Sequence, residues 1–199
     1  MELTGCFLNK YNSYPNSLVR LPVQKKNLYL LKISAMENTI LNKQQIEQKI
    51  VRIAHEIVEN TFSHNRIFIA GISGNGMILA EKIATIVKTV ADQQVELVTI
   101  TLDKEAPLSH PVKLSCPSDD LTHSVVILVD DVINSGRTMQ YALMKILETP
   151  VDFIKTVTLV DRTHRRYPIR ADFVGITLTT TLKDRVEVTF ENEARAYLV

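Results

Sequence analysis

The sequence predicts an α/β fold in which a central parallel sheet is covered by helices on both faces. Short apolar runs alternate with amphipathic helical runs, and one apolar run, Val125–Val129, is aliphatic at every position. Alternating strands and helices favour a parallel sheet, and a strand without polar positions is typical of its buried centre. Because ligands bind beyond the carboxyl ends of the strands in such folds, the turns after the strands are candidates for a functional site.

The predicted elements follow one another in a regular order. Asn42 is expected to cap a first helix, because isoleucines recur at helical spacing from Ile46 to Ile57. Further helices are expected at Met77–Val90 and Arg137–Leu147, and strands at Arg66–Ala70, Val95–Leu102, Val125–Val129, Phe153–Val160, Ala171–Gly175 and Val186–Phe190. Asp103–His123 is rich in Pro, Ser and Asp, and is expected to be a loop.

Composition restricts the class of protein. The chain has 199 residues, of which 45% are hydrophobic and 23% charged, as expected for a globular domain. A net charge of +1 argues against a general nucleic-acid binder, and no apolar run approaches the roughly 20 residues that cross a membrane. Cys6 and Cys116 match no metal-ligand spacing and are expected to be free thiols in a reducing cytoplasm.

The amino-terminal segment differs from the rest. Residues 1–37 are expected to form an irregular leader before a domain of residues 38–199, and basic residues outnumber Glu2, the single acid before residue 36. A secretory signal is a weaker alternative, because the apolar run LYLLKI is short and contains Lys32. Regular periodic sequence begins only after Met36, which makes Met36 a candidate for the natural start.

The turn after the aliphatic strand carries the clearest chemical signal. Two adjacent carboxylates at the end of a buried strand lose solvation and repel each other unless they bind hydroxyl groups or a cation. The glycine-containing turn that follows leads directly into a helix, whose free N–H groups and dipole favour a phosphate monoester. A capped helix after an acidic turn is the alternative. The predicted site comprises Asp130, Asp131, Val132, Ile133, Asn134, Ser135, Gly136, Arg137 and Thr138.

The string Val125–Thr138 resembles the phosphoribosyl pyrophosphate (PRPP) motif of the type I phosphoribosyltransferases. The resemblance implies their fold, a central parallel sheet with helices on both faces plus a small hood region. It also implies that Asp130 and Asp131 hold the ribose hydroxyls at the catalytic centre, while the rest of the turn cradles the 5-phosphate. The glycine-rich turn Gly71–Gly76 could be a plain tight turn, but in the family this turn approaches pyrophosphate. That role is then implied for Ser73, Gly74, Asn75 and Gly76.

Three further segments, Arg52–Asn60, Val160–Gly175 and Arg185–Phe190, resemble the PyrR family of bifunctional pyrimidine-operon regulators and uracil phosphoribosyltransferases. This resemblance implies transfer of phosphoribosyl from PRPP to uracil with Mg²⁺, which gives UMP and pyrophosphate. It also implies a cytoplasmic homodimer or larger homo-oligomer. The candidates for the base side are Val160, Asp161 and Arg162.

Two segments depart from the PyrR pattern. The first glycine turn usually contains Thr-Arg-Gly in that family, whereas this chain has Gly74-Asn75-Gly76 and so lacks a cation there. The loop after Leu102 usually contains Arg-Asp-Asp, and here Lys104 is the candidate replacement for the lost charge. Both departures lie on the pyrophosphate side, so the phosphoribosyl site is better supported than the complete transferase reaction.

A local basic cluster points to RNA as a further partner. The cluster comprises His164, Arg165, Arg166 and Arg170, together with Arg162. The alternative is a solvated loop whose arginines pair with Asp161, Asp172 or Asp184, and Ile176 stands where relatives have a lysine. Three functions therefore stay open: a uracil phosphoribosyltransferase, a catalytically weak nucleotide-sensing RNA-binding regulator of pyrimidine genes, and a phosphoribosyltransferase for another base such as a purine.

Overall fold

The computed structural model describes residues 38–179, 184–191 and 193–199. The chain divides into two units, Met1–Asn38 and Thr39–Val199, and the second contains every helix and strand described below. The predicted leader, residues 1–37, and Cys6 lie outside the described residues, whereas Cys116 is a free thiol. None of the helices in the described part of the chain is long and apolar enough to cross a bilayer.

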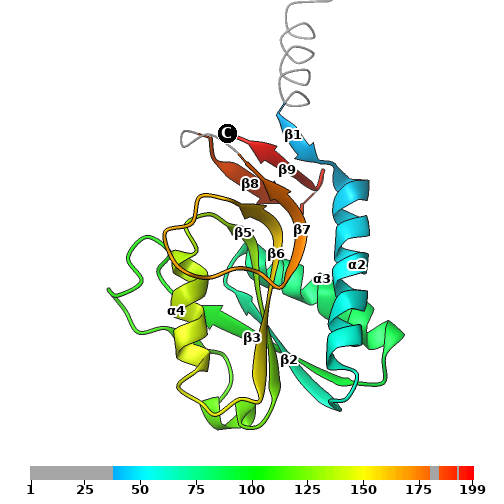
Figure 1. The fold of residues 1–199 in the computed structure, drawn as a ribbon, viewed down its shortest axis with the longest axis vertical. Helices are drawn as coiled ribbons and strands as arrows, with labels where there is room; N and C mark the ends of the chain where they lie inside the picture. Colours follow the sequence, from blue (N-terminus) through cyan, green and yellow to red (C-terminus); the bar gives the residue numbers. More distant parts are fainter. Residues whose placement is uncertain (1–37, 180–183, 192) are drawn as a thin grey trace, which may run out of the picture. The chain divides into compact units, whose positions relative to one another are not determined.

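Six strands form the central sheet in the order β4-β3-β2-β5-β6-β7 (Figure 1). The five parallel strands are β2 (Arg66–Ile72), β3 (Gln94–Thr101), β5 (Val125–Ile133), β6 (Phe153–Arg162) and β7 (Phe173–Leu178). At one edge, β4 (Lys113–Leu114) pairs antiparallel with β3. The predicted α/β fold is confirmed, with the correction that this edge makes the sheet mixed.

Helices cover both faces of the sheet, as the sequence predicts. The helices are α2 (Lys43–Thr61), α3 (Asn75–Val90) and α4 (Arg137–Ile146). Because successive side chains of a strand point to opposite faces, Ile127 of β5 joins the apolar cluster that contains residues of α2 and α3, whereas Val126 and Leu128 join the cluster beneath α4. The Asn42 side chain caps α2 by accepting a hydrogen bond of 2.9 Å from the Gln45 backbone N–H.

A second, three-stranded antiparallel sheet forms the small hood region. It has the order β1-β9-β8 and consists of β1 (Thr39–Leu41), β8 (Val186–Thr189) and β9 (Arg195–Leu198). Figure 1 draws it beside the end of the central sheet where β5 and β6 finish. The sequence predicts only β8, because β1 and β9 are too short to show a period and are held by long-range pairing.

The structure also shifts several predicted boundaries. β5 continues through Asp130 and Asp131, because its backbone still pairs with β6 at Val132 and Ile133. β6 likewise extends to Arg162, and α3 begins at Asn75 rather than Met77. The predicted loop Asp103–His123 contains β4 and a short 3-10 helix, Ser118–Leu121. The candidate carboxylates therefore lie within a sheet strand rather than in a turn.

Candidate functional site

A cavity of about 370 Å³ lies at the carboxyl end of β5. The turn between β5 and α4 forms one wall, and strand β8 of the hood sheet forms another. Its lining consists of residues 130–139, residues 185–188, Asn75, Lys104 and Glu105. All nine residues of the predicted ribose-phosphate segment, 130–138, therefore line one cavity, as do Asn75 and Lys104 from the predicted pyrophosphate side.

Gly136 determines the shape of the turn at the start of α4. Its φ of +83° is in the left-handed region, and a β-carbon there would lie 2.7 Å from Cγ2 of Ile169. The preceding carbonyl, of Ser135, accepts hydrogen bonds from the backbone N–H groups of Arg166 (2.9 Å) and Tyr167 (3.1 Å). The segment after β6 therefore supports the turn from behind and leaves the amino end of α4 directed at the cavity, where it favours an anion.

The two carboxylates at the end of β5 differ in their surroundings. Asp130 is buried, with 4% of its surface exposed, whereas Asp131 is half-buried. Burial, together with repulsion from Asp131, raises the pKa of Asp130 to about 7, and the Lys104 ammonium opposes that rise. The positive charge of Lys104 does not cancel the burial and the mutual repulsion of the two carboxylates. This suits a ligand that brings hydroxyl donors or a cation.

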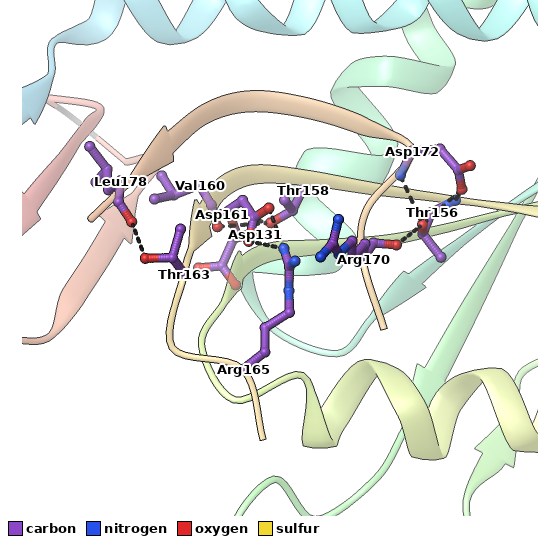
Figure 2. A network of polar contacts seen from close by, with 10 residues as sticks. All are labelled: Asp131, Thr156, Thr158, Val160, Asp161, Thr163, Arg165, Arg170, Asp172 and Leu178. Carbon is purple, nitrogen blue, oxygen red and sulfur yellow. Dashed lines mark hydrogen bonds and ion pairs between the residues drawn. The ribbon is translucent and has the colours of Figure 1, made fainter. Parts of the chain in front are cut away.

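Asp131 is held by groups from two other parts of the chain. Its carboxylate Oδ2 accepts a hydrogen bond of 3.2 Å from Nδ2 of Asn75, and its backbone carbonyl accepts one of 3.1 Å from the Thr158 hydroxyl of β6 (Figure 2). Nδ2 of Asn75 also donates to the carbonyl of Val188 in β8, at 2.8 Å. The orientation of Asp131 is thus fixed from the glycine turn and from the neighbouring strand.

Arg137 directs its guanidinium at the loop after β3. That group donates hydrogen bonds to the carbonyls of Lys104 (2.9 Å) and Glu105 (2.8 Å). The loop is also folded on itself, because the Asp103 carboxylate accepts hydrogen bonds from the N–H groups of Glu105 and Ala106, which lower the pKa of Asp103. These contacts place the Lys104 ammonium 3.5 Å from Oδ1 of Asp130.

The first glycine turn approaches the end of β5 closely. A β-carbon at Gly76 would lie 3.0 Å from both Oδ1 of Asp130 and the carbonyl of Val129, and Gly74 has a φ of +90°. Ser73 donates its backbone N–H to the carbonyl of Ile100. In this turn, Asn75 lines the cavity, whereas Ser73, Gly74 and Gly76 lie outside the lining.

The predicted base-side residues lie behind the turn rather than in the cavity lining. Val160 is buried in the core, and Arg162 donates a hydrogen bond of 2.7 Å to Oδ1 of Asn134. Asp161 forms an ion pair with Arg165, which reaches it from the segment after β6 (Figure 2). Arg162 therefore supports the turn after β5 through Asn134.

The basic cluster is divided between paired and exposed side chains. Arg165 forms one of the ion pairs expected from the sequence, with Asp161, while Asp172 pairs instead with Lys155 at 3.3 Å. Arg166 and Arg170 are exposed, and His164 is half-buried. The positively charged surface that this cluster exposes is therefore smaller than the sequence suggests.

Sequence reasoning missed part of the cavity wall. Glu105, Met139 and residues 185–188 line the cavity, and none of them was predicted as a site residue. Arg185–Phe190 resembled a PyrR segment, but its place above β5 depends on pairing between β8 and β9, which local patterns do not encode. The Arg185 side chain adds a cation to this wall.

Comparison with known proteins gives consistent results. The model of the phosphoribosyl transferase domain matches residues 36–190. A bifunctional protein PyrR from Pelotomaculum thermopropionicum is 36% identical, over 75% of this chain and 86% of the relative. Another from Chloroflexus aurantiacus is 38% identical, over 76% and 87%.

Solved structures give the same fold. A hypoxanthine-guanine phosphoribosyltransferase from Bacillus anthracis superposes with a TM-score of 0.64 at 20% identity, covering 81% of this chain and 98% of that one. A hypoxanthine phosphoribosyltransferase from Trypanosoma cruzi, in complex with IMP, gives a TM-score of 0.67 at 15% identity, covering 81% and 89%. Identities this low establish the architecture alone.

Proposed function

Since the chain belongs to the phosphoribosyltransferase family, and within it to the PyrR group, we propose that it transfers the 5-phosphoribosyl group of PRPP to uracil. The products are UMP and pyrophosphate. The observation that carries the proposal is a single cavity that joins the carboxylates of Asp130 and Asp131 to the turn Asn134–Thr138. A furanose hydroxyl pair and a phosphate require this combination of acceptors and backbone donors.

Each wall of the cavity has a task in this reaction. The carboxylates accept hydrogen bonds from the ribose hydroxyls, and the N–H groups at the start of α4 hold the 5-phosphate. Positive charge develops on the ribose ring as the bond to pyrophosphate breaks and the bond to the base nitrogen forms. Asp131, fixed by Asn75 and Thr158, stabilises that charge without acting as a nucleophile. Lys104 is the cation for the leaving group.

Magnesium fits the donor set. Mg²⁺ binds through one or two carboxylates together with substrate phosphate oxygens, and it retains several water ligands. Asp130 and Asp131 provide two adjacent carboxylates, and a bound cation would oppose the burial and the repulsion that raise the pKa of Asp130. When bound with PRPP, the ion supplies charge neutralisation for the pyrophosphate group.

A steady-state assay tests the proposal. Purified protein is incubated with PRPP, Mg²⁺ and each nucleobase in turn, and pyrophosphate release is measured beside the Asp131→Asn variant. We expect release with uracil and a loss of at least a hundredfold in the variant. Release only with a purine would change the acceptor, and no release with any base would overturn the transferase function.

A second function, nucleotide-sensing regulation through RNA, is favoured by the first glycine turn. Gly71–Gly76 contains no cationic residue, and the Asn75 amide is engaged by Asp131 and Val188. In this proposal the protein binds UMP or a related nucleotide, catalyses weakly and changes its affinity for leader RNA. Filter binding of a pyrimidine-operon leader at several salt concentrations, with and without UMP, tests it. RNA affinity that is independent of UMP would contradict it.

The remaining expectations concern location and assembly. We propose that the chain acts in the cytoplasm, where PRPP and nucleobases are available, as a homodimer or a larger homo-oligomer. Sedimentation velocity at several protein concentrations measures the assembly, and a single monomeric species throughout would contradict this proposal.

A further inference from the structure

We propose that Asn75 is a positioning residue that ties strand β8 of the hood sheet to Asp131, so that the two walls of the cavity are held at a fixed separation. The nature of the ligand rests on the proposed function, whereas the tie itself is a property of the folded chain. Asn75 is thus assigned a role different from direct contact with pyrophosphate.

The tie is a three-way junction at one amide group. Nδ2 of Asn75 has two hydrogens, and its two acceptors are Oδ2 of Asp131 at 3.2 Å and the carbonyl of Val188 at 2.8 Å. Asn75 is the first residue of α3, Asp131 lies in β5 and Val188 in β8. Asn75 therefore joins segments that lie 56 and 113 residues away in sequence, and both hydrogens of its amide are used.

The position of β8 explains why it needs such a contact. β8 is an edge strand of the hood sheet, since the strand order is β1-β9-β8. One side of its backbone pairs with β9, while the other side has carbonyl groups that no neighbouring strand of that sheet covers. Asn75 supplies a hydrogen bond to one of these, on the side that faces Asp131.

The glycines that flank Asn75 bring its backbone close enough for a short side chain to make this contact. Gly74 has a φ of +90°, which a side chain would disfavour. Gly76 lies so close to β5 that a β-carbon would be 3.0 Å from Oδ1 of Asp130. The sequence Gly74-Asn75-Gly76 is in this way suited to a tie between two walls.

A ligand that touches both walls depends on the tie more than a ligand that touches one. Ribose 5-phosphate matches the wall formed by the end of β5 and the turn before α4. UMP adds a base to the same ribose and phosphate, and we infer that this base lies against the wall of residues 185–188, which also lines the cavity. Loss of the Asn75 donor is therefore expected to weaken UMP binding more than ribose 5-phosphate binding.

The experiment compares Asn75→Ala and Asn75→Leu with Asn60→Ala. The leucine variant nearly keeps the volume of the side chain and has no donor, and it adds no negative charge beside Asp131, so it separates hydrogen bonding from volume. Asn60 is an exposed residue on α2 whose amide also donates to a backbone carbonyl, that of Glu56, and it lies outside the cavity. Calorimetry measures the dissociation constants of UMP and ribose 5-phosphate, and hydrogen exchange follows residues 184–191 and 125–133 in each protein.

We expect both Asn75 variants to weaken UMP binding roughly tenfold or more, with a smaller loss for ribose 5-phosphate, which depends on Asn75 only through Asp131. Exchange should accelerate in residues 184–191 and stay unchanged in 125–133, and Asn60→Ala should match the wild type. Equal losses for the two ligands, or unchanged exchange in residues 184–191, would overturn the assignment. If the wild type binds neither ligand, the proposed function fails, and the exchange data alone decide whether the tie exists.

Discussion

The Lys104 ammonium lies 3.5 Å from Oδ1 of Asp130, and it belongs to a loop that Arg137 holds through two backbone carbonyls. A buried carboxylate at the end of the central strand is thus paired with a half-exposed cation from a different segment. The contact only partly offsets the burial of Asp130, whose pKa is raised to about 7. Asp130 therefore gains or loses its proton near neutral pH, and the net charge of the cavity changes with it.

This raised pKa predicts a pH dependence of stability. A carboxyl whose pKa is higher in the folded state than in the unfolded chain stabilises the fold at low pH, and this contribution is lost as pH rises through the folded pKa. Its window runs from the ordinary Asp pKa of about 4 to about 7. The Asp130→Asn variant has no titrating group at this position. Its free energy of unfolding, compared with that of the wild type at the same pH, should therefore rise between about pH 4 and about pH 7.

Urea denaturation of both proteins between about pH 5 and about pH 9 measures this difference, whose slope cannot exceed about 1.4 kcal/mol per pH unit for one group. Ligand affinity should change in the opposite direction, because ribose hydroxyls need an ionised acceptor. Parallel stability curves for the two proteins across this range would show that Asp130 titrates normally.

Removal of Lys104 tests its assignment to the leaving group. Lys104→Gln takes away the cation 3.5 Å from Asp130 and is expected to raise the KM for PRPP about tenfold or more, with a smaller effect on the KM for uracil. Lys113→Gln in the edge strand β4 is the matched control, since that exposed lysine lies outside the cavity. An equal rise in both KM values for Lys104→Gln would argue against a role at pyrophosphate.

Local patterns predict the fold and the cavity wall formed by residues 130–138, because both are encoded in short stretches. Val125–Val129 is aliphatic and buried at each position, and Gly136 adopts the left-handed conformation that its turn requires. The cavity wall formed by residues 185–188 could not be predicted from the sequence, for a physical reason. Residues 185–188 line the cavity as part of a strand segment that pairs with β9, and this long-range pairing is not visible in the local sequence.

The basic residues at the end of β6 and just after it show a second limit of local sequence patterns. Sequence proximity groups Arg162, Arg165 and Arg166 into one basic cluster, yet their environments differ. Arg162 is buried against Asn134, Arg165 pairs with Asp161, and Arg166 is exposed. The net charge of a segment therefore overstates the positively charged surface that an RNA could contact. In this segment, Arg162 is buried and Arg165 is paired with Asp161 at the end of β6.

Two glycines with positive φ provide a matched test of the turns. Gly136→Ala combines an unfavourable φ with a contact of 2.7 Å to Ile169, whereas a β-carbon at Gly74 would meet nothing within 4 Å. We expect Gly74→Ala to lower the free energy of unfolding by about 1–3 kcal/mol, because its φ of 90° and ψ of −136° lie in a region that is nearly restricted to glycine. Gly136→Ala adds the clash with Ile169 to a left-handed backbone conformation, and is expected to lower it by about 2–4 kcal/mol. Urea denaturation measures both, and a loss below about 2 kcal/mol in Gly136→Ala would mean that Ile169 moves aside without cost.

Arg165 and Arg166 are adjacent but are expected to respond differently to substitution. Arg165→Ala leaves the carboxylate of Asp161, a residue with 7% of its surface exposed, without its ion-pair partner. Breaking such a pair is expected to lower the free energy of unfolding by about 2–4 kcal/mol. Exposed Arg166 should contribute less than about 0.5 kcal/mol to stability.

If leader RNA binds at this segment, the exposed side chain is the one that contacts phosphate. Arg166→Ala should then weaken RNA binding at low salt and reduce the salt dependence by about one counterion, without a change in the urea midpoint. Denaturation curves and filter binding on the same protein preparations measure both quantities. A salt dependence that is unchanged in Arg166→Ala would remove Arg166 from the RNA surface, while the ion pair of Arg165 would be judged by its unfolding curve alone.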